Sequence, residues 1–224
     1  STADWCTYPS DKAKTNSTML AMFHAYRADE NIRDGFADEG EQKAQEATSN
    51  VGDDAKSAAQ ALLDSPNVKF QTPEQRGYME QTAKDGTQTL DCGGKANMNG
   101  KLLGMLVEAS KKYKITIGAQ AAGHQCDGGW HPKGSAVDIN GIAQLNQPQQ
   151  MMLGVDQGND SYYRDNEKDI VKEFYEYLDS LAGTAGVKME LGQKQCFAPK
   201  PLPSVKNSSL VTDICNHAHV GVEQ

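Results

Sequence analysis

The sequence predicts an α+β fold in which a small, central, largely antiparallel sheet is accompanied by an additional helical region at the N-terminus. Several segments repeat apolar residues at helical spacing, whereas a few short segments show the alternation that is typical of strands. Helices precede and separate these few strands, which favours an α+β arrangement.

The N-terminal part of the chain is polar and has a helical pattern. We therefore divide the chain into a helical N-terminal region, residues 1–67, and an α+β domain, residues 68–224. Lys12–Arg27 and Asp53–Leu63 are the candidate helices of the first region. That region contains no candidate catalytic residue.

Three helices are expected in the second region. One begins after Thr72, because Pro73 follows at the first helical position and a glutamine lies three residues after the cap. Another covers Asn99–Tyr113, where leucines and a valine form an apolar stripe. The last covers Asn166–Ala182, and Gly183 is placed to end it.

The expected strands are short and lie between and after these helices. They are Lys114–Ala119, Ala136–Asn140 and His217–Val222, with Val187–Leu191 as a further candidate. A glycine-rich loop at Gly123–Trp130 separates the first two.

The charge of the chain excludes some classes of partner. A formal net charge of −8 argues against nucleic-acid binding, because a phosphate-binding surface needs a basic footprint. No apolar stretch approaches the roughly 18 residues of a membrane span. We expect a monomer.

Five cysteines are scattered along the chain, and none forms a C-x-x-C pair. Single cysteines in a polar chain suit disulfides in an oxidising compartment, although reduced cysteines in a cytosolic protein are the alternative. We take as a hypothesis that Cys92 pairs with Cys126 and Cys196 with Cys215, which leaves Cys6 unpaired. On this interpretation the protein is secreted, or lies in the cell wall or periplasm.

A histidine and an aspartate seven residues apart mark the first chemical motif. His131 leaves the glycine-rich loop, and Asp138 lies on the strand that follows. Side chains alternate along a strand, so Val137 and Ile139 point one way and Asp138 the other. A lone buried carboxylate is costly, so Asp138 needs a partner, which His131 and a metal ion would supply.

The second motif is the pair His217 and His219, which share one face of the last strand beside Gly221. Both imidazoles can reach one ion, or one binds the ion while the other does acid–base work. Two histidines and an aspartate suit Zn²⁺, and three protein ligands leave a position open for water, as in catalytic sites. The alternative is that these are ordinary surface or packing residues.

The run from His131 to Asp138, followed far downstream by the pair at 217 and 219, resembles the zinc D-Ala-D-Ala peptidase and lysostaphin-type metallopeptidase group, to which hedgehog-type domains are related. The resemblance covers about Thr72 to Val222. It implies a small α+β domain with a central antiparallel sheet. It also implies zinc held by His131, Asp138 and His219, and a peptide of the bacterial cell wall as substrate.

The resemblance also implies a mechanism, with two departures. One branch of the group uses a glutamate three residues before the last ligand as general base, but Asn216 stands there. The other branch uses the first histidine of the pair, which implies His217 as acid–base group or oxyanion stabiliser, with Asp213 as an alternative. A water activated by zinc would attack an amide carbonyl, in a carboxypeptidase or an endopeptidase reaction. Many relatives grip the substrate carboxylate with an arginine where this chain has Gln120.

Residues around the first ligand complete the expected site. His124, Gln120, Asp127 and Trp130 are candidate substrate-binding residues, although His124 can equally be a loop histidine bonded to backbone and Trp130 a packing residue. A zinc-dependent cell-wall or ligand-binding module without catalysis is the alternative function.

Overall fold

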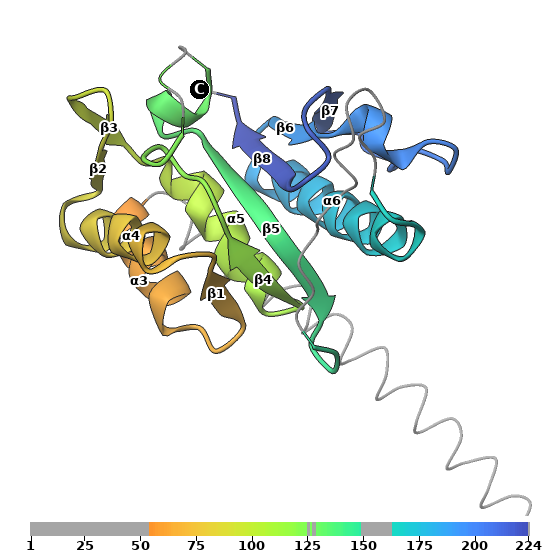
Figure 1. Ribbon diagram of the computed structural model, residues 1–224, viewed down its shortest axis with the longest axis horizontal. Coiled ribbons are helices and arrows are strands. Elements are labelled where there is room, and N and C mark those ends of the chain that lie inside the picture. Colours follow the sequence, from red (N-terminus) through yellow and green to blue (C-terminus); the bar gives the residue numbers. More distant parts are fainter. Residues whose placement is uncertain (1–53, 125, 127–128, 149–162, 224) are drawn as a thin grey trace, which may run out of the picture. The chain divides into compact units, whose positions relative to one another are not determined.

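The computed structural model describes residues 54–124, 126, 129–148 and 163–223 (Figure 1). All of them belong to one compact unit, Ala47–Gln224. The expected helix at Lys12–Arg27 and residues Cys6 and Asp127 lie outside the described residues. Within the described ranges, no helix is long and apolar enough to cross a membrane.

Two α-helices open the described part of the chain. α3, Ala55–Asp64, begins at Asp54, whose carboxylate accepts hydrogen bonds from two backbone amides of the first turn. Ala58, Ala59 and Leu62 of α3 are fully buried in the core. α3, which the sequence division assigned to the N-terminal region, therefore packs in this unit, against α4 and α5.

The other helices begin where the sequence predicts. α4, Pro73–Asp85, has Thr72 as its cap, and α5, Gly100–Ser110, has Asn99. α6 covers Asp165–Ala185 and continues beyond the glycine expected to end it. Gly183 lies inside the helix, where its lack of a side chain lets Asn207 pack closely, since a Cβ would lie 2.6 Å from the Asn207 amide nitrogen. Gly186, with φ of 63°, ends the helix instead.

A six-stranded sheet is the centre of the unit, with the order β1-β4-β5-β8-β6-β7. Its strands are β1 (Val68–Phe70), β4 (Tyr113–Ile117), β5 (Ala136–Gln144), β6 (Met189–Gly192), β7 (Ser208–Val211) and β8 (Ala218–Val222). Neighbouring strands among the four central ones are antiparallel, as expected. Each edge strand is parallel to its neighbour, β1 to β4 and β7 to β6, so the whole sheet is mixed.

Smaller elements surround this sheet. β2 (Thr87–Thr89) and β3 (Lys95–Asn97) form a separate antiparallel pair. The 3₁₀-helix η2 covers His131–Lys133, and η3 covers Lys194–Phe197.

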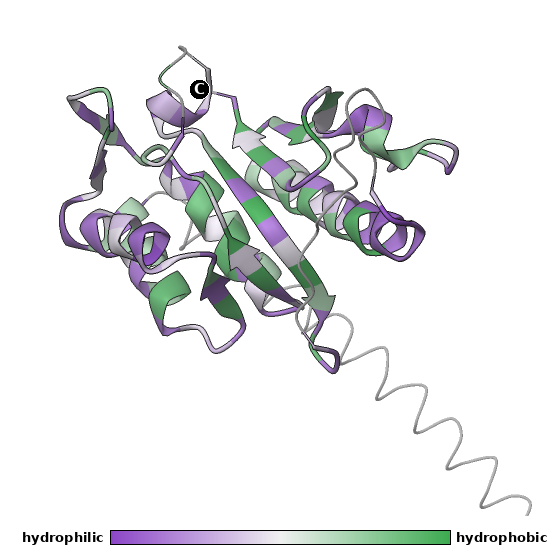
Figure 2. Cartoon of the chain, viewed as in Figure 1, coloured by the Kyte–Doolittle hydropathy of each residue, from purple (hydrophilic) through white to green (hydrophobic). Residues whose placement is uncertain are grey.

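The hydrophobic core lies between the sheet and the helices α5 and α6, which lie behind the sheet in Figure 1. Hydrophobic and hydrophilic residues alternate along β5 and β8 (Figure 2). The apolar side chains join the core, among them Val137, Ile139, Ala218 and Val220. The polar side chains between them belong to the other face of the sheet, and the candidate site lies there.

Two disulfides cross-link the unit, with the expected pairing. Cys92 and Cys126 are bonded, with Cα atoms 6.2 Å apart. Cys196 and Cys215 are bonded, with Cα atoms 5.7 Å apart. Both pairings were expected from the sequence, and they indicate an oxidising environment.

Candidate metal centre

The strand register brings the first two candidate ligands together. Asp138 on β5 is the direct partner of His219 on β8. The backbone of Asp138 is also held from the β4 side, because its amide donates to the carbonyl of Ala119 and its carbonyl accepts from the amide of Gly118, both at 2.8 Å. Asp138 is thus fixed in the middle of the sheet, with its carboxylate on the face away from the core.

His131 reaches the same point from a tight turn. Gly134 ends η2 with φ of 74°, and its amide donates to the carbonyl of His131 at 2.8 Å. A Cβ at this glycine would lie 2.0 Å from the carbonyl oxygen of Asn97, so only glycine fits. The turn places the His131 imidazole against the sheet, where the residue is only 4% exposed.

Three side-chain atoms form a nearly equilateral triangle. His131 Nε2 lies 3.2 Å from Asp138 Oδ1 and 3.3 Å from His219 Nδ1, and His219 Nδ1 lies 3.3 Å from Asp138 Oδ1. Charge-assisted hydrogen bonds are normally shorter, about 2.7–2.9 Å. Bonds of about 2.0–2.1 Å from a tetrahedral zinc ion separate two ligand atoms by about 3.3 Å. The triangle therefore has the dimensions of one face of a zinc coordination tetrahedron.

The tautomer of His131 supports the same interpretation. Its Nδ1 lies 2.9 Å from the backbone carbonyl oxygen of Gln120, so Nδ1 carries the proton and donates it. With that proton in place, either a second proton on Nε2 or a bound metal cation must lie between Nε2 and the carboxylate of Asp138. Two lone pairs that meet in a buried place repel each other unless a cation lies between them. A hydrogen bond from the second ring nitrogen to a backbone carbonyl is typical of metal-binding histidines.

The charge of Asp138 fits the role of a ligand. Burial alone would raise the pKa of its carboxyl, but the facing imidazoles of His131 and His219 outweigh burial and hold the pKa well below its usual range. Asp138 is therefore ionised, as a metal ligand must be. Two groups that share Asp138 could hold a metal ion: His124 and His131 with Asp138, and His217 and His219 with Asp138.

His217 lies at the edge of the triangle and is held by neighbours of its own. Its Nε2 is 3.3 Å from Asp138 Oδ1 and 3.3 Å from Asp213 Oδ2, and its Nδ1 donates to Asn216 Oδ1 at 2.6 Å. Burial alone would lower the pKa of His217, but the hydrogen bond to Asp213 and the charge of Asp138 raise it above its ordinary value. From the sequence, Asp213 was an alternative to His217 as the acid–base group. In the structure the two side chains contact each other directly.

The loop that carries Asp213 is anchored to its surroundings. The side-chain amide of Gln195 donates to the carbonyl of Asp213. The Cys196–Cys215 disulfide joins the same two segments next to this hydrogen bond. The hydroxyl of Tyr163, 2.6 Å from the carbonyl oxygen of His217, holds the segment that leads into β8. These contacts fix the approach of His217 to the cluster.

The expected substrate-binding residues occupy different places. The His124 ring stacks on the His131 ring, with centroids 4.0 Å apart and planes at 4°, so His124 lies at the cluster. Gln120 is fully buried, and its side-chain amide bonds Gln75 and Gln88. Its side chain is thus held within the protein, and its backbone carbonyl oxygen accepts a hydrogen bond from Nδ1 of His131. Asp127 lies outside the described residues.

Trp130 lies next to the strand of the last ligand. A Cβ at Gly221 would be 3.5 Å from a ring carbon of Trp130, so glycine lets the indole approach β8. Trp130, Lys133, Ser135 and Glu223 line a hollow of about 300 Å³ beside it. Trp130 therefore forms a wall near the cluster.

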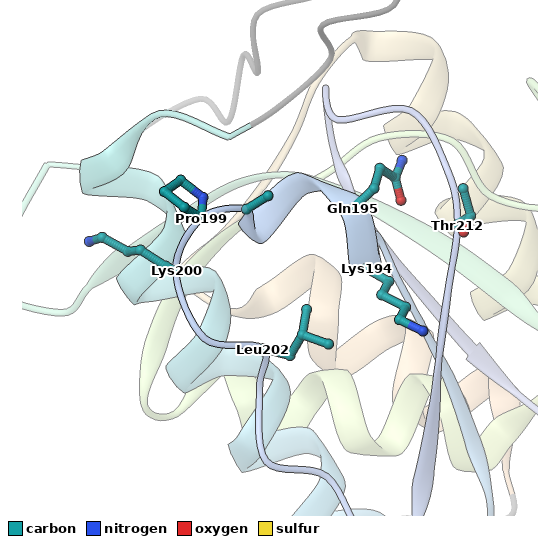
Figure 3. A pocket seen from close by; sticks show the side chains of 7 residues that line it. Lys194, Gln195, Pro199, Lys200, Leu202 and Thr212 are labelled. Carbon is teal, nitrogen blue, oxygen red and sulfur yellow. The ribbon is translucent and has the colours of Figure 1, made fainter.

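A separate hollow of about 510 Å³ lies around η3 (Figure 3). Its lining residues are Lys194, Gln195, Ala198, Pro199, Lys200, Leu202 and Thr212. None of these is a histidine, cysteine or carboxylate, so this hollow offers no metal ligands of the usual kinds. It adjoins the cluster through Gln195, which bonds the backbone of Asp213.

Comparisons of the chain with protein-family models, with curated proteins and with solved structures gave no match.

Proposed function

We propose that this protein is a secreted zinc-dependent peptidase that hydrolyses an amide bond in the peptides of peptidoglycan. The triangle of His131 Nε2, Asp138 Oδ1 and His219 Nδ1 carries the proposal, because its sides of 3.2–3.3 Å match the spacing of ligands on tetrahedral zinc. Two nitrogen donors and one carboxylate oxygen are also ligands that zinc accepts.

Three protein ligands leave one coordination position for water or substrate. Zinc in such a site lowers the pKa of water towards neutrality and polarises a carbonyl group. The protein supplies the rest of the chemistry. The Gln120 carbonyl keeps the proton of His131 on Nδ1, and the buried Asp138 stays ionised.

His217 is the proposed acid–base group. Its Nε2 lies 3.3 Å from Asp138 Oδ1, which puts this nitrogen beside the ligand triangle without being part of it. Asp213 orients the imidazole from the other side and favours its protonated form. In this proposal His217 starts in its neutral form, Nε2 takes a proton from the attacking water, and the resulting imidazolium protonates the leaving amine or stabilises the negatively charged oxygen.

The substrate class rests on the resemblance of the His131–Asp138 run and the 217/219 pair to the cell-wall peptidases. Related enzymes that remove a C-terminal residue grip its carboxylate with an arginine at the place of Gln120. Here that side chain is fully buried and hydrogen-bonded within the protein. This favours cleavage of an internal amide over removal of a C-terminal residue. The two disulfides support export.

Two measurements test the proposal. Elemental analysis of the purified protein should find about one zinc per chain, and His131→Ala should lose it. Purified peptidoglycan of known cross-linking should be hydrolysed, the chelator-treated protein should be inactive, and mass spectrometry of the fragments should identify the cleaved bond. Zinc binding without hydrolysis of any peptidoglycan would instead support a non-catalytic zinc-dependent binding module. A chain without bound metal would refute both.

A further inference from the structure

One ring nitrogen of the last candidate ligand has no partner. His219 is 6% exposed, its Nδ1 faces Asp138 and His131, and its Nε2 is buried without a hydrogen-bond partner among the described residues. Buried ring nitrogens are normally satisfied, and metal-binding histidines usually donate this second proton to a carbonyl or a carboxylate. His131 follows that rule through Gln120, so His219 should have an acceptor of its own.

The neighbouring strand presents a carboxylate on the same face of the sheet. On β6, Glu190 is the direct partner of Gly221 on β8, two residues along from His219. Side chains alternate along β6, so Glu190 and Gly192 share one face. A Cβ at Gly192 would lie 2.9 Å from the Cβ of His219, which puts that face on the side of the cluster. Glu190 is therefore a diagonal neighbour of His219.

The imidazole of His219 extends towards this carboxylate. A Cβ at Gly221 would be 3.3 Å from His219 Nε2, so the ring extends over Gly221. The Cβ positions of directly opposed strand residues are about 4.5–5.5 Å apart, and diagonal neighbours are within reach of long side chains. A glutamate at position 190 can thus bring its carboxylate to His219 Nε2. Gly221 has no side chain that would block the path.

We propose that Glu190 is a positioning residue of the metal centre, whose carboxylate accepts a hydrogen bond from Nε2–H of His219 and keeps the lone pair on Nδ1. This inference rests on the proposed zinc site. Without an acceptor at Nε2, the proton can move to Nδ1 and be donated to Asp138. That tautomer cannot bind a metal through Nδ1. Glu190 thus selects the metal-binding form of His219, as the Gln120 carbonyl does for His131.

The test compares Glu190→Ala, Glu190→Gln and the control Glu223→Gln. Glu223 directly follows β8 and lines the hollow beside Trp130, so this control removes a nearby negative charge without removing the proposed hydrogen bond to His219. Zinc affinity is measured by competition with a fluorescent chelator. The proton position on His219 is read from imidazole ¹⁵N chemical shifts of the metal-free and zinc-loaded proteins.

Glu190→Ala should weaken zinc binding by about 10–100-fold and move the His219 proton from Nε2 in the metal-free protein. Glu190→Gln should keep most of the affinity, because its amide oxygen also accepts a hydrogen bond, and Glu223→Gln should change little. If the wild-type chain binds zinc and Glu190→Ala changes neither affinity nor tautomer, the inference is overturned. An equal loss in Glu223→Gln would reduce the effect to charge alone and overturn it as well. A wild-type chain that binds no zinc would refute the proposed function itself.

Discussion

A single added methyl group at position 192 should disturb the metal centre. Gly192 lies at the end of β6, close to the side chains of His219 and Asp213. In Gly192→Ala the new Cβ would lie 2.9 Å from His219 Cβ and 3.6 Å from Asp213 Cβ. The contact with His219 is thus too close, whereas the contact with Asp213 is an ordinary one.

The size of the effect follows from these distances. Ordinary contact begins at 3.4 Å, so the methyl group and His219 must move apart by about 0.5 Å (3.4 minus 2.9). Metal–ligand distances hold to within about 0.2 Å, so a displacement of His219 by this amount breaks the ligand geometry. We expect zinc affinity to fall tenfold or more, which corresponds to about 1.4 kcal/mol per factor of ten. Overpacking should also cost the metal-free protein about 1–3 kcal/mol.

The assay is chelator competition for zinc affinity, together with thermal unfolding of the metal-free and zinc-loaded proteins. Gly77→Ala is the matched control, because Gly77 lies in α4 with no atom within 4 Å of its added Cβ. The control should keep its zinc affinity and gain up to about 1 kcal/mol of stability from better helix propensity. A Gly192→Ala protein with wild-type zinc affinity would refute the assignment of His219 as a ligand in this geometry.

Three further predictions concern catalysis, redox state and pH. His217→Ala should retain about one zinc per chain and lose about 10²-fold or more in hydrolysis rate, whereas loss of the metal would make His217 a ligand. Thiol titration of the unfolded, unreduced protein should find about one free thiol, because four cysteines are bonded in pairs, and five thiols would contradict both disulfides. Zinc affinity measured by calorimetry should fall as the pH is lowered, since protons compete with the metal for the histidine ligands, and a flat profile would argue against them.

Local patterns in the sequence predicted most of the longer helices and strands. Helix caps and the alternation of polar and apolar residues along a strand are signals that lie within a few residues. Thr72 caps α4 through its own hydroxyl, which accepts from the amide of Gln75. The alternation along β5 separated Asp138 from Val137 and Ile139, and the fold keeps that separation. The same alternation put His219 beside Gly221 on the opposite face from the core.

Four short strands and the end of α6 did not follow from local patterns. β1, β2 and β3 have three residues each and β7 has four, which is too short for a periodic signal, and each is held by pairing with another strand. The sequence therefore predicted the antiparallel centre of the sheet but not its parallel edges. Gly183 was expected to end α6, yet the side chain of Asn207 packs there from a distant segment, and Gly186 ends the helix.

The sequence by itself determined which residue types are present for a metal centre, because histidine, aspartate and their positions along strands can be read directly. Only the tertiary structure decided how they meet. The register that pairs Asp138 with His219 joins residues 81 positions apart in the chain. The sheet likewise brings His131 to His219, 88 positions away. Such contacts depend on strand pairing and on side-chain packing across the sheet, and no spacing within one segment encodes them.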